Sequence, residues 1–406
     1  MATSNCNPCS RRCDCKHCCL DDLVWYYYNE TTFNINEIAS AIGLHHGLWR
    51  STRHIKRVLH RLGLGRRRRE SSMEDLVPAM VKEMDGGSRR YGIRLMHQVL
   101  KVKHKLVVKR QTVRDIMESI HPGTMDKHKQ RRLKRREYSN KGPNHILHID
   151  GYDKLSSFGF YIHGAIDGWS RKVIWLDVGG TNKDPKVIGS YFLDFVESVG
   201  GTSKILRMDN GTENGMLADI QSFLMESVNW QHYPSYIFGR SVANQRIEKF
   251  WQFCYHEFAV FWIDLFKDME ICGVYNPSIW LHRVLLQFCF TPLLRSELNH
   301  LLHTWNFHRV RKMKNTLCPS GIPESLYSMP ELFNCIDQKI PVPLDVVSVC
   351  REACGAIPQF EYGCKDEIAE ELLELMVLLH KEVPLTWADS LQLYGELLVT
   401  FESFDF

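Results

Sequence analysis

Three strand-like segments follow one another between residues 144 and 180, and this succession limits the fold more than any other feature of the sequence. Residues 144–152 (NHILHIDGY) alternate apolar and polar side chains. Residues 158–170 hold a second apolar run that ends in a glycine-containing turn, and residues 171–180 are rich in β-branched and aromatic side chains. Short turns between such segments predict antiparallel pairing. The region is therefore expected to form an antiparallel meander.

Helix and strand patterns alternate after this meander. Residues 184–200 are expected to form a helix, because Asp184 is a good N-cap residue and Pro185 suits the first helical position. The elements that follow are a strand over residues 204–209 that ends on Asp209, a short strand over 228–234, and an amphipathic helix over 241–258 that begins at Ser241. The order β-β-β-α-β-α-β-α predicts an α/β domain with a mixed five-stranded sheet and flanking helices, which is the ribonuclease H-like arrangement.

Three carboxylates fall at the ends of these elements. Asp150 ends the first strand, Asp209 ends the fourth, and Glu248 lies in the second turn of the last helix, with 38 residues between the last two acids. Hard cations such as Mg²⁺ and Mn²⁺ take oxygen ligands, and two of them ~3.5–4 Å apart assist in-line displacement at phosphorus. Singly, each acid has an ordinary alternative as a turn cap or a solvated side chain. In this order and spacing they predict a metal-binding triad.

Three other acids lie close to the triad in sequence and are not expected to bind metal directly: Asp153, Asp167 and Glu213. Asp153 follows the first strand's acid by three residues, Asp167 falls in a turn, and Glu213 could orient the loop after Asp209.

Four motifs around these acids resemble the integrase core family, which retroviral integrases and many DNA transposases share. The motifs are HIDGYDKL, AIDGWSRKV, RMDNGTEN and NQRIEKFW, and the resemblance extends over about residues 88–330. It points in particular to the integrase-core proteins that transposon-derived eukaryotic genes encode. It implies that Asp150 bridges two Mg²⁺ or Mn²⁺ ions, that Asp209 and Glu248 each hold one, and that a multimer cleaves and joins strands of duplex DNA.

The resemblance also suggests DNA contacts around the last predicted helix. Polar and basic residues of this helix contact the DNA end in integrases, which implies such a role for Asn244, Arg246 and Lys249. Arg240 lies in the preceding stretch, residues 237–244, which is similar to the flexible active-site loop of the family. The basic residue expected two turns after the glutamate is Tyr255 here, so recognition of the DNA end should differ from the retroviral pattern.

Charge is distributed very unevenly along the chain. Residues 1–149 hold 30 Lys and Arg against 14 Asp and Glu, a net charge of +16, whereas the remaining residues hold 21 against 33, a net charge of −12. A basic N-terminal third is typical of proteins that bind a polyanion. The basic residues expected to contact DNA there are Arg53, Lys56, Arg57, Arg66, Arg67, Arg131, Arg132, Lys134 and Arg135.

Two helix pairs are expected within this basic region. Residues 31–64 predict a helix-turn-helix whose first helix is capped by Asn34 or Asn36 and whose second is capped by Ser51. The second helix has an apolar face and a basic face, which would suit the major groove of DNA. A solvated helix in a small bundle remains the alternative. Residues 88–120 repeat the pattern and are similar to the segment that precedes the catalytic domain in insertion-sequence transposases.

The cysteines and the basic linker help to predict the cellular compartment of the protein. No apolar segment is long enough for a membrane span, and the N-terminus lacks the apolar run of a secretory signal. Reduced thiols inside the cell are therefore expected, and the pairs Cys6–Cys9 and Cys15–Cys18 could bind zinc or belong to a disordered thiol-rich tail. The basic run over residues 126–141 resembles a nuclear-localisation patch, which predicts a nuclear protein.

Residues 364–381 predict an acidic amphipathic helix that either packs on the core or binds another protein. Its apolar face comprises Ile368, Leu372, Leu375, Met376 and Leu379. The predicted segments are a Cys-rich, disordered tail (1–25), an all-α helix-turn-helix (26–70), a second helix-turn-helix with basic linker (71–141), an integrase-like core (142–330) and an acidic helical region (331–406).

Three functions stay open at this point. The first is an active DNA integrase or transposase, and the second is a domesticated, transposon-derived protein that binds DNA or chromatin partners without catalysis. The third is a nuclease that hydrolyses DNA and never joins it, because the ribonuclease H-like fold also supports hydrolysis.

Overall fold

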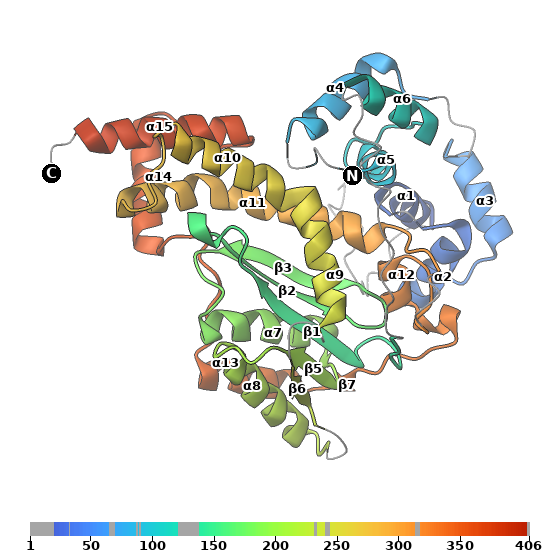
Figure 1. The fold of residues 1–406 in the computed structure, drawn as a ribbon. Helices are drawn as coiled ribbons and strands as arrows, with labels where there is room; N and C mark the ends of the chain where they lie inside the picture. The colour runs from blue at the N-terminus through green and yellow to red at the C-terminus, as the bar shows by residue number, and fades with distance from the viewer. Residues whose placement is uncertain are drawn as a thin grey trace, which may run out of the picture. The chain divides into compact units, whose positions relative to one another are not determined.

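The structure is a computed structural model that describes residues 20–31, 33–64, 70–86, 88, 91–120, 138–230, 234–239, 244–312 and 317–403. Two compact units make up the chain (Figure 1). The first comprises Met1–Asp85, Tyr91–Ser139 and Thr304–Ile336, and the second comprises Gly86–Arg90, Asn140–His303 and Asp337–Phe406. Among the helices described, none combines the length and the apolar character that a bilayer span requires.

A mixed five-stranded sheet organises the second unit. Its strands are β1 (Ile146–Tyr152), β2 (Tyr161–Asp167), β3 (Val173–Gly179), β5 (Ile205–Met208) and β6 (Tyr236–Phe238). The order in the sheet is β3-β2-β1-β5-β6; β2 runs antiparallel to both neighbours, while β1, β5 and β6 run parallel. The meander and the ribonuclease H-like α/β fold class predicted from the sequence are confirmed.

Helices α7 (Pro185–Val199) and α8 (Asn214–Ser227) supply the crossovers that parallel strands require. Asp184 caps α7 as predicted, because its Oδ1 accepts the Lys186 N–H at 2.9 Å, and Pro185 takes the first helical position. Ile188 and Phe192 of α7 are fully buried with Leu217 of α8 in the main core of this unit. Each such side chain contributes roughly 1.5–3 kcal/mol through removal from water.

Two sequence predictions about this unit are wrong in position. The fifth strand lies at Tyr236–Phe238 rather than at residues 228–234, because the chain after α8 turns back through a Trp230 N–H bond to Met225 O at 2.9 Å. Helix α9 spans Gln245–Cys254 and starts four residues later than expected, which places Glu248 in its first turn. Hydrogen bonds between Asn244 and β1, described below, set the start of this helix at Gln245 rather than at Ser241.

Further helices surround the sheet (Figure 1). They are α10 (Val260–Ile271), α11 (Trp280–Phe307), α13 (Leu344–Cys354), α14 (Asp366–Leu378) and α15 (Trp387–Ser403), and a π-helical turn at Tyr255–Ala259 joins α9 to α10. The acidic helix is confirmed as α14, and it buries Leu372 and Met376 of the predicted apolar face.

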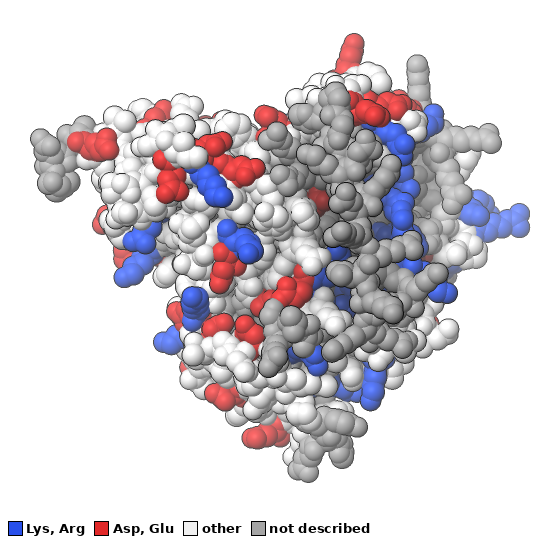
Figure 2. Space-filling model, viewed as in Figure 1, with Lys and Arg blue, Asp and Glu red and all other residues white. Residues whose placement is uncertain are grey.

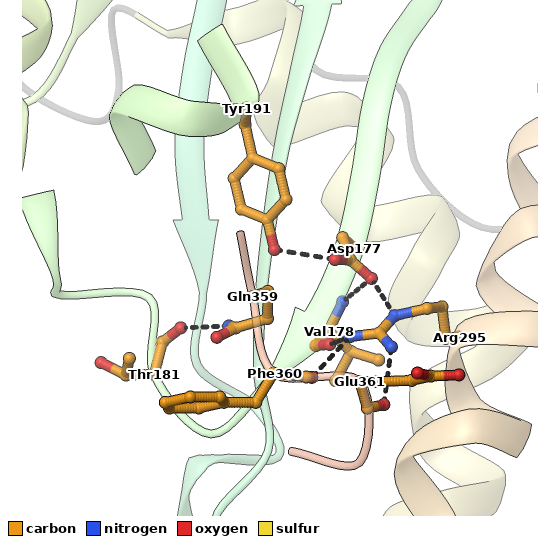
Figure 3. A network of polar contacts seen from close by, with 8 residues as sticks. All are labelled: Asp177, Val178, Thr181, Tyr191, Arg295, Gln359, Phe360 and Glu361. Atoms are coloured by element: carbon orange, nitrogen blue, oxygen red, sulfur yellow. Dashed lines mark hydrogen bonds and ion pairs between the residues drawn. The ribbon is translucent and has the colours of Figure 1, made fainter. Parts of the chain in front are cut away.

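Residues 337–403 are an integral part of the second unit. The short strand β7 (Ile340–Pro341) pairs with β4 (Gly201–Thr202). Arg295 of α11 donates to Asp177 Oδ1 of β3 at 2.7 Å and to the main-chain oxygens of Phe360 and Glu361 at 3.1 and 2.6 Å (Figure 3). This network fastens the C-terminal segment to the edge strand of the sheet, where unpaired backbone groups would otherwise be exposed.

The first unit is helical. It contains α1 (Leu20–Glu30), α2 (Ile35–His46), α3 (Thr52–Arg61), α4 (Met73–Met84), α5 (Ile93–Val102), α6 (Arg110–Ile120) and α12 (Pro323–Ser328). Asn34 caps α2 through a capping box with Glu37, and Ser51 caps α3, so both predicted caps are confirmed. Helix α1 begins inside the tail expected to be disordered over residues 1–25, because Leu23, Val24 and Tyr27 form a buried face. The six cysteines of residues 6–19 lie outside the described residues.

Candidate functional site

Asp150 and Asp209 lie at the same edge of the sheet. Strands β1 and β5 are parallel neighbours, with His148 paired to Arg207. Asp209 directly follows the last residue of β5, Met208. Extended by two residues on each chain segment, the same register places Asp150 level with Asp209. The carboxyl ends of adjacent parallel strands therefore present both acids at one edge of the sheet.

Asp150 is mostly buried and lies among negative charges. Burial is the main cause that raises the pKa of its carboxyl from 3.8 to about 7, and the charges of Asp209 and Glu248 raise it further. The Trp251 Nε1–H donates to Asp150 Oδ2 at 3.0 Å and acts in the opposite direction. The structure thus brings the three acids of the predicted triad close enough to interact electrostatically.

Asp209 is oriented by the start of α8. Its Oδ1 accepts the Asn214 Nδ2–H at 2.7 Å and the Gly211 N–H at 3.2 Å. No described residue donates a hydrogen bond to its Oδ2. Within the described residues, these hydrogen bonds hold the Asp209 carboxylate through its Oδ1.

Helix α9 carries Glu248 and is attached to β1 on both sides of that residue. The Asn244 side chain is 3% exposed, and its Nδ2 donates to Ile149 O at 3.0 Å. Its Oδ1 lies 2.5 Å from His148 Nδ1. Burial, with Arg207 and Arg246 nearby, lowers the pKa of His148 to about 3, so this imidazole is neutral.

Trp251 forms the other attachment of α9. Its indole contacts Tyr152 with ring centroids 5.0 Å apart, and a Cβ on Gly164 would lie 3.0 Å from its ring. A larger residue at position 164 would require the indole to shift by a few tenths of an ångström, so glycine suits this close approach of Trp251 to β2.

The donor chemistry of the triad fits a divalent cation. Asp150, Asp209 and Glu248 offer hard oxygen ligands, which suit Mg²⁺ or Mn²⁺. A cation would also offset the repulsion that raises the pKa of Asp150. The fit is one of ligand type only, because the triad is not grouped around one ion: among the described residues, no three His, Cys, Asp or Glu side chains are placed so that they could hold a metal.

The neighbouring acids have other partners. Asp167 is completely buried and accepts hydrogen bonds from Asn144 N, Trp169 N, Ser170 N and Ser170 Oγ at 2.7–3.1 Å. The exposed Asp153 accepts the Asn182 Nδ2–H at 2.7 Å. Glu213 precedes the first residue of α8. Asp167 is accordingly a structural residue of the β2–β3 turn.

The basic candidates lie in several places. Arg53, Lys56 and Arg57 are exposed on α3, opposite its buried apolar face. In the view of Figure 2, basic side chains lie over the part of the first unit that holds α3. On α9, Arg246 Nε donates to Gly168 O at 2.9 Å, while Lys249 is exposed. Outside the described residues lie Arg66, Arg67, Arg131, Arg132, Lys134, Arg135 and Arg240.

Sequence reasoning did not anticipate the hydrogen bonds that Asn244 and Trp251 make to β1. Asn244 was expected to contact DNA, yet its amide is buried against β1. Trp251 was not singled out at all. A signal for it exists, because a buried indole N–H needs an acceptor and Trp251 follows Glu248 by one helical turn.

Comparisons with known proteins were made for the whole chain. The integrase core domain family matches residues 137–333. No curated protein matches the chain. Among solved structures, the chain is similar to one from an intasome of simian T-cell lymphotropic virus in complex with a PP2A regulatory subunit. That likeness has 15% identity and a TM-score of 0.29, and it covers 62% of this chain and 77% of the viral one. This likeness is too weak to support the fold, which rests instead on the strand order of the sheet.

Proposed function

Because residues 137–333 form an integrase core domain, we propose that this protein is a DNA-binding integrase or transposase whose triad cleaves and joins strands of duplex DNA. The observation that carries the proposal is the placement of Asp150 level with Asp209 on parallel strands, within electrostatic reach of Glu248. The charges of Asp209 and Glu248 raise the pKa of Asp150, and a bound cation would reduce this repulsion, which favours a metal-dependent function.

The roles proposed for the three acids follow from their positions. Asp150 interacts with both other acids, which suits a ligand shared by two ions, whereas Asp209 and Glu248 would each hold one. Bound Mg²⁺ or Mn²⁺ supplies activation of the attacking oxygen and stabilisation of the leaving oxygen. Asn214 and Trp251 orient the carboxylates of Asp209 and Asp150. Since the pKa of Asp150 is about 7, protons should compete with metal, and metal affinity should rise between pH 6 and pH 8.

The DNA itself would be held mainly by basic side chains. The exposed Arg53, Lys56 and Arg57 of α3 could contact phosphates or the major groove, and Lys249 of α9 could contact the backbone near the triad. Such contacts predict binding that weakens with salt. We also propose that the protein acts as a homo-oligomer in the nucleus, with the basic run over residues 126–141 as its import signal.

Nicking and strand-transfer assays on duplex DNA with Mg²⁺ or Mn²⁺ test this function. Glu248→Gln should lower both activities by more than about 100-fold, beyond what outer partners of a metal ligand usually contribute. Glu213→Gln is the matched control, because this acid lies near Asp209 and outside the triad, and it should retain activity. The alternative, DNA or chromatin binding without catalysis, would replace the proposal if folded wild-type protein binds DNA and shows no metal-dependent cleavage. Nicking without joining would indicate a nuclease.

A further inference from the structure

Glu248 lies between two residues that attach α9 to β1. Asn244 precedes Glu248 by four residues and bonds to Ile149 and His148, and Trp251 follows Glu248 by three residues and bonds to Asp150. The attachment points on β1 are therefore three consecutive residues, the last of which is an acid of the triad. Two attachments on one helical face, about one turn to either side of Glu248, fix both the rotation and the axial position of the helix.

The orientation of the Asn244 amide follows from its partners. Ile149 O can only accept, so the amide nitrogen must face it, and the amide oxygen then faces His148. An amide oxygen accepts, so His148 must donate from Nδ1. The Asn244 main-chain oxygen also accepts the Glu248 N–H at 3.1 Å. One buried residue thus links the backbone of Glu248 to the two residues that precede Asp150.

We propose that Asn244 and His148 form a positioning clamp that holds Glu248 opposite Asp150, and that Asn244 does not contact DNA. This inference rests on the proposed function for its consequence, which is metal binding. The burial of Asn244 favours the clamp over a DNA contact, because this residue is only 3% exposed and its amide oxygen and nitrogen are both directed at β1.

Isothermal titration of DNA-free protein with Mn²⁺, beside DNA binding measured without metal, separates the two roles. Asn244→Ala should weaken Mn²⁺ binding by about 10- to 100-fold, the range typical of residues that orient metal ligands, and leave DNA affinity within about twofold. Gln245→Ala is the matched control, because Gln245 is the exposed neighbour on the same helix and should change neither value. Unchanged Mn²⁺ affinity with weakened DNA binding would overturn the clamp.

Two conservative changes at His148 test the same contact from the other side. Asparagine can present an N–H close to the position of the imidazole Nδ1, whereas glutamine presents its amide closer to the position of Nε2. His148→Asn should therefore keep Mn²⁺ affinity within a few-fold of wild type, and His148→Gln should weaken it about as much as Asn244→Ala does. Equal affinities in the two variants would overturn the clamp.

Hydrogen exchange keeps the clamp testable if the proposed function fails. Wild-type protein that binds no Mn²⁺ would contradict the metal site, but the clamp should still protect the backbone of α9. Asn244→Ala should then speed exchange over Gln245–Cys254 by about tenfold or more, because two buried bonds that hold the start of the helix are lost. Exchange no faster than in Gln245→Ala would contradict the clamp independently of any metal.

Discussion

Asp150, which is partly buried, and Asp167, which is fully buried, are carboxylates of the same sheet with different surroundings. Asp167, at the β2–β3 turn, accepts four hydrogen bonds from neighbouring backbone and hydroxyl groups. Asp150, at the carboxyl end of β1, accepts a hydrogen bond from Trp251 and one from the Gly151 backbone, and it has two acids as neighbours. A carboxylate surrounded by donors stabilises a turn, whereas burial and neighbouring carboxylates raise the pKa of Asp150 and make it a candidate functional residue.

The largest effect should come from removing the structural acid. Asp167→Ala would leave three buried backbone N–H groups without acceptors, each at a cost of about 1–3 kcal/mol. We expect a loss of about 4 kcal/mol or more in the free energy of unfolding, measured by urea denaturation. Asp153→Ala, at an exposed acid, should cost about 0.5 kcal/mol. Similar losses in the two variants would contradict the structural role assigned to the hydrogen bonds of Asp167.

Asp177 is a third kind of carboxylate in this sheet, because the guanidinium of Arg295 neutralises its charge. Arg295 donates to Asp177, to Val178 O and to the C-terminal segment, and Tyr191 OH donates to the same carboxylate (Figure 3). Arg295→Ala should therefore cost about 2–3 kcal/mol in unfolding free energy and speed hydrogen exchange around residues 359–361. Arg295→Lys keeps the charge without the planar fork, so it should recover only part of the loss. Full recovery would show that charge alone holds the segment.

Removing the charge of Asp150 should stabilise the metal-free protein. Because its pKa rises from 3.8 to about 7 on folding, the folded state binds more protons than the unfolded chain between these pH values. Stability should thus fall as pH rises from about 4 to about 7 and stay level above. Asp150→Asn removes this penalty, which is at most about 4 kcal/mol and, with solvent screening, roughly 1–3 kcal/mol at pH 8. Thermal unfolding at pH 5 and pH 8 measures it; a gain that does not grow with pH would contradict the pKa shift.

Local patterns in the sequence were enough to predict most of the sheet. Strands β1 to β3 have alternating or β-branched residues, and α7 has both its capping aspartate and its first-turn proline. The fifth strand was misplaced because β6 has only three residues, too few to show alternation. The start of α9 was misplaced because a tertiary contact of Asn244 outweighs the local sequence pattern that predicted a helix from Ser241.

The site was predictable only in part for a related reason. The order and spacing of Asp150, Asp209 and Glu248 pointed to a triad, but sequence alone could not distinguish Asp150 from Asp167, since each ends a strand and precedes a glycine. What separates them is the number of donors folded around each carboxylate, which depends on residues far away in the chain. Trp251, the donor to Asp150, lies 101 residues from it.

The smallest expected effect concerns that one donor. Trp251→Phe keeps an aromatic ring against Tyr152 and Gly164 but removes the N–H that holds the ionised form of Asp150. Because this bond lowers the pKa of Asp150, its loss should raise that pKa, by up to about one unit or ~1.4 kcal/mol. The pH at which Mn²⁺ binding reaches half its plateau affinity should move upward by the same amount, measured by calorimetry between pH 6 and pH 9. The variant would make Asp150 still less like Asp167, so an unchanged or lower midpoint would mean that burial and the neighbouring acids, and not a shortage of donors, set the protonation state of this carboxylate.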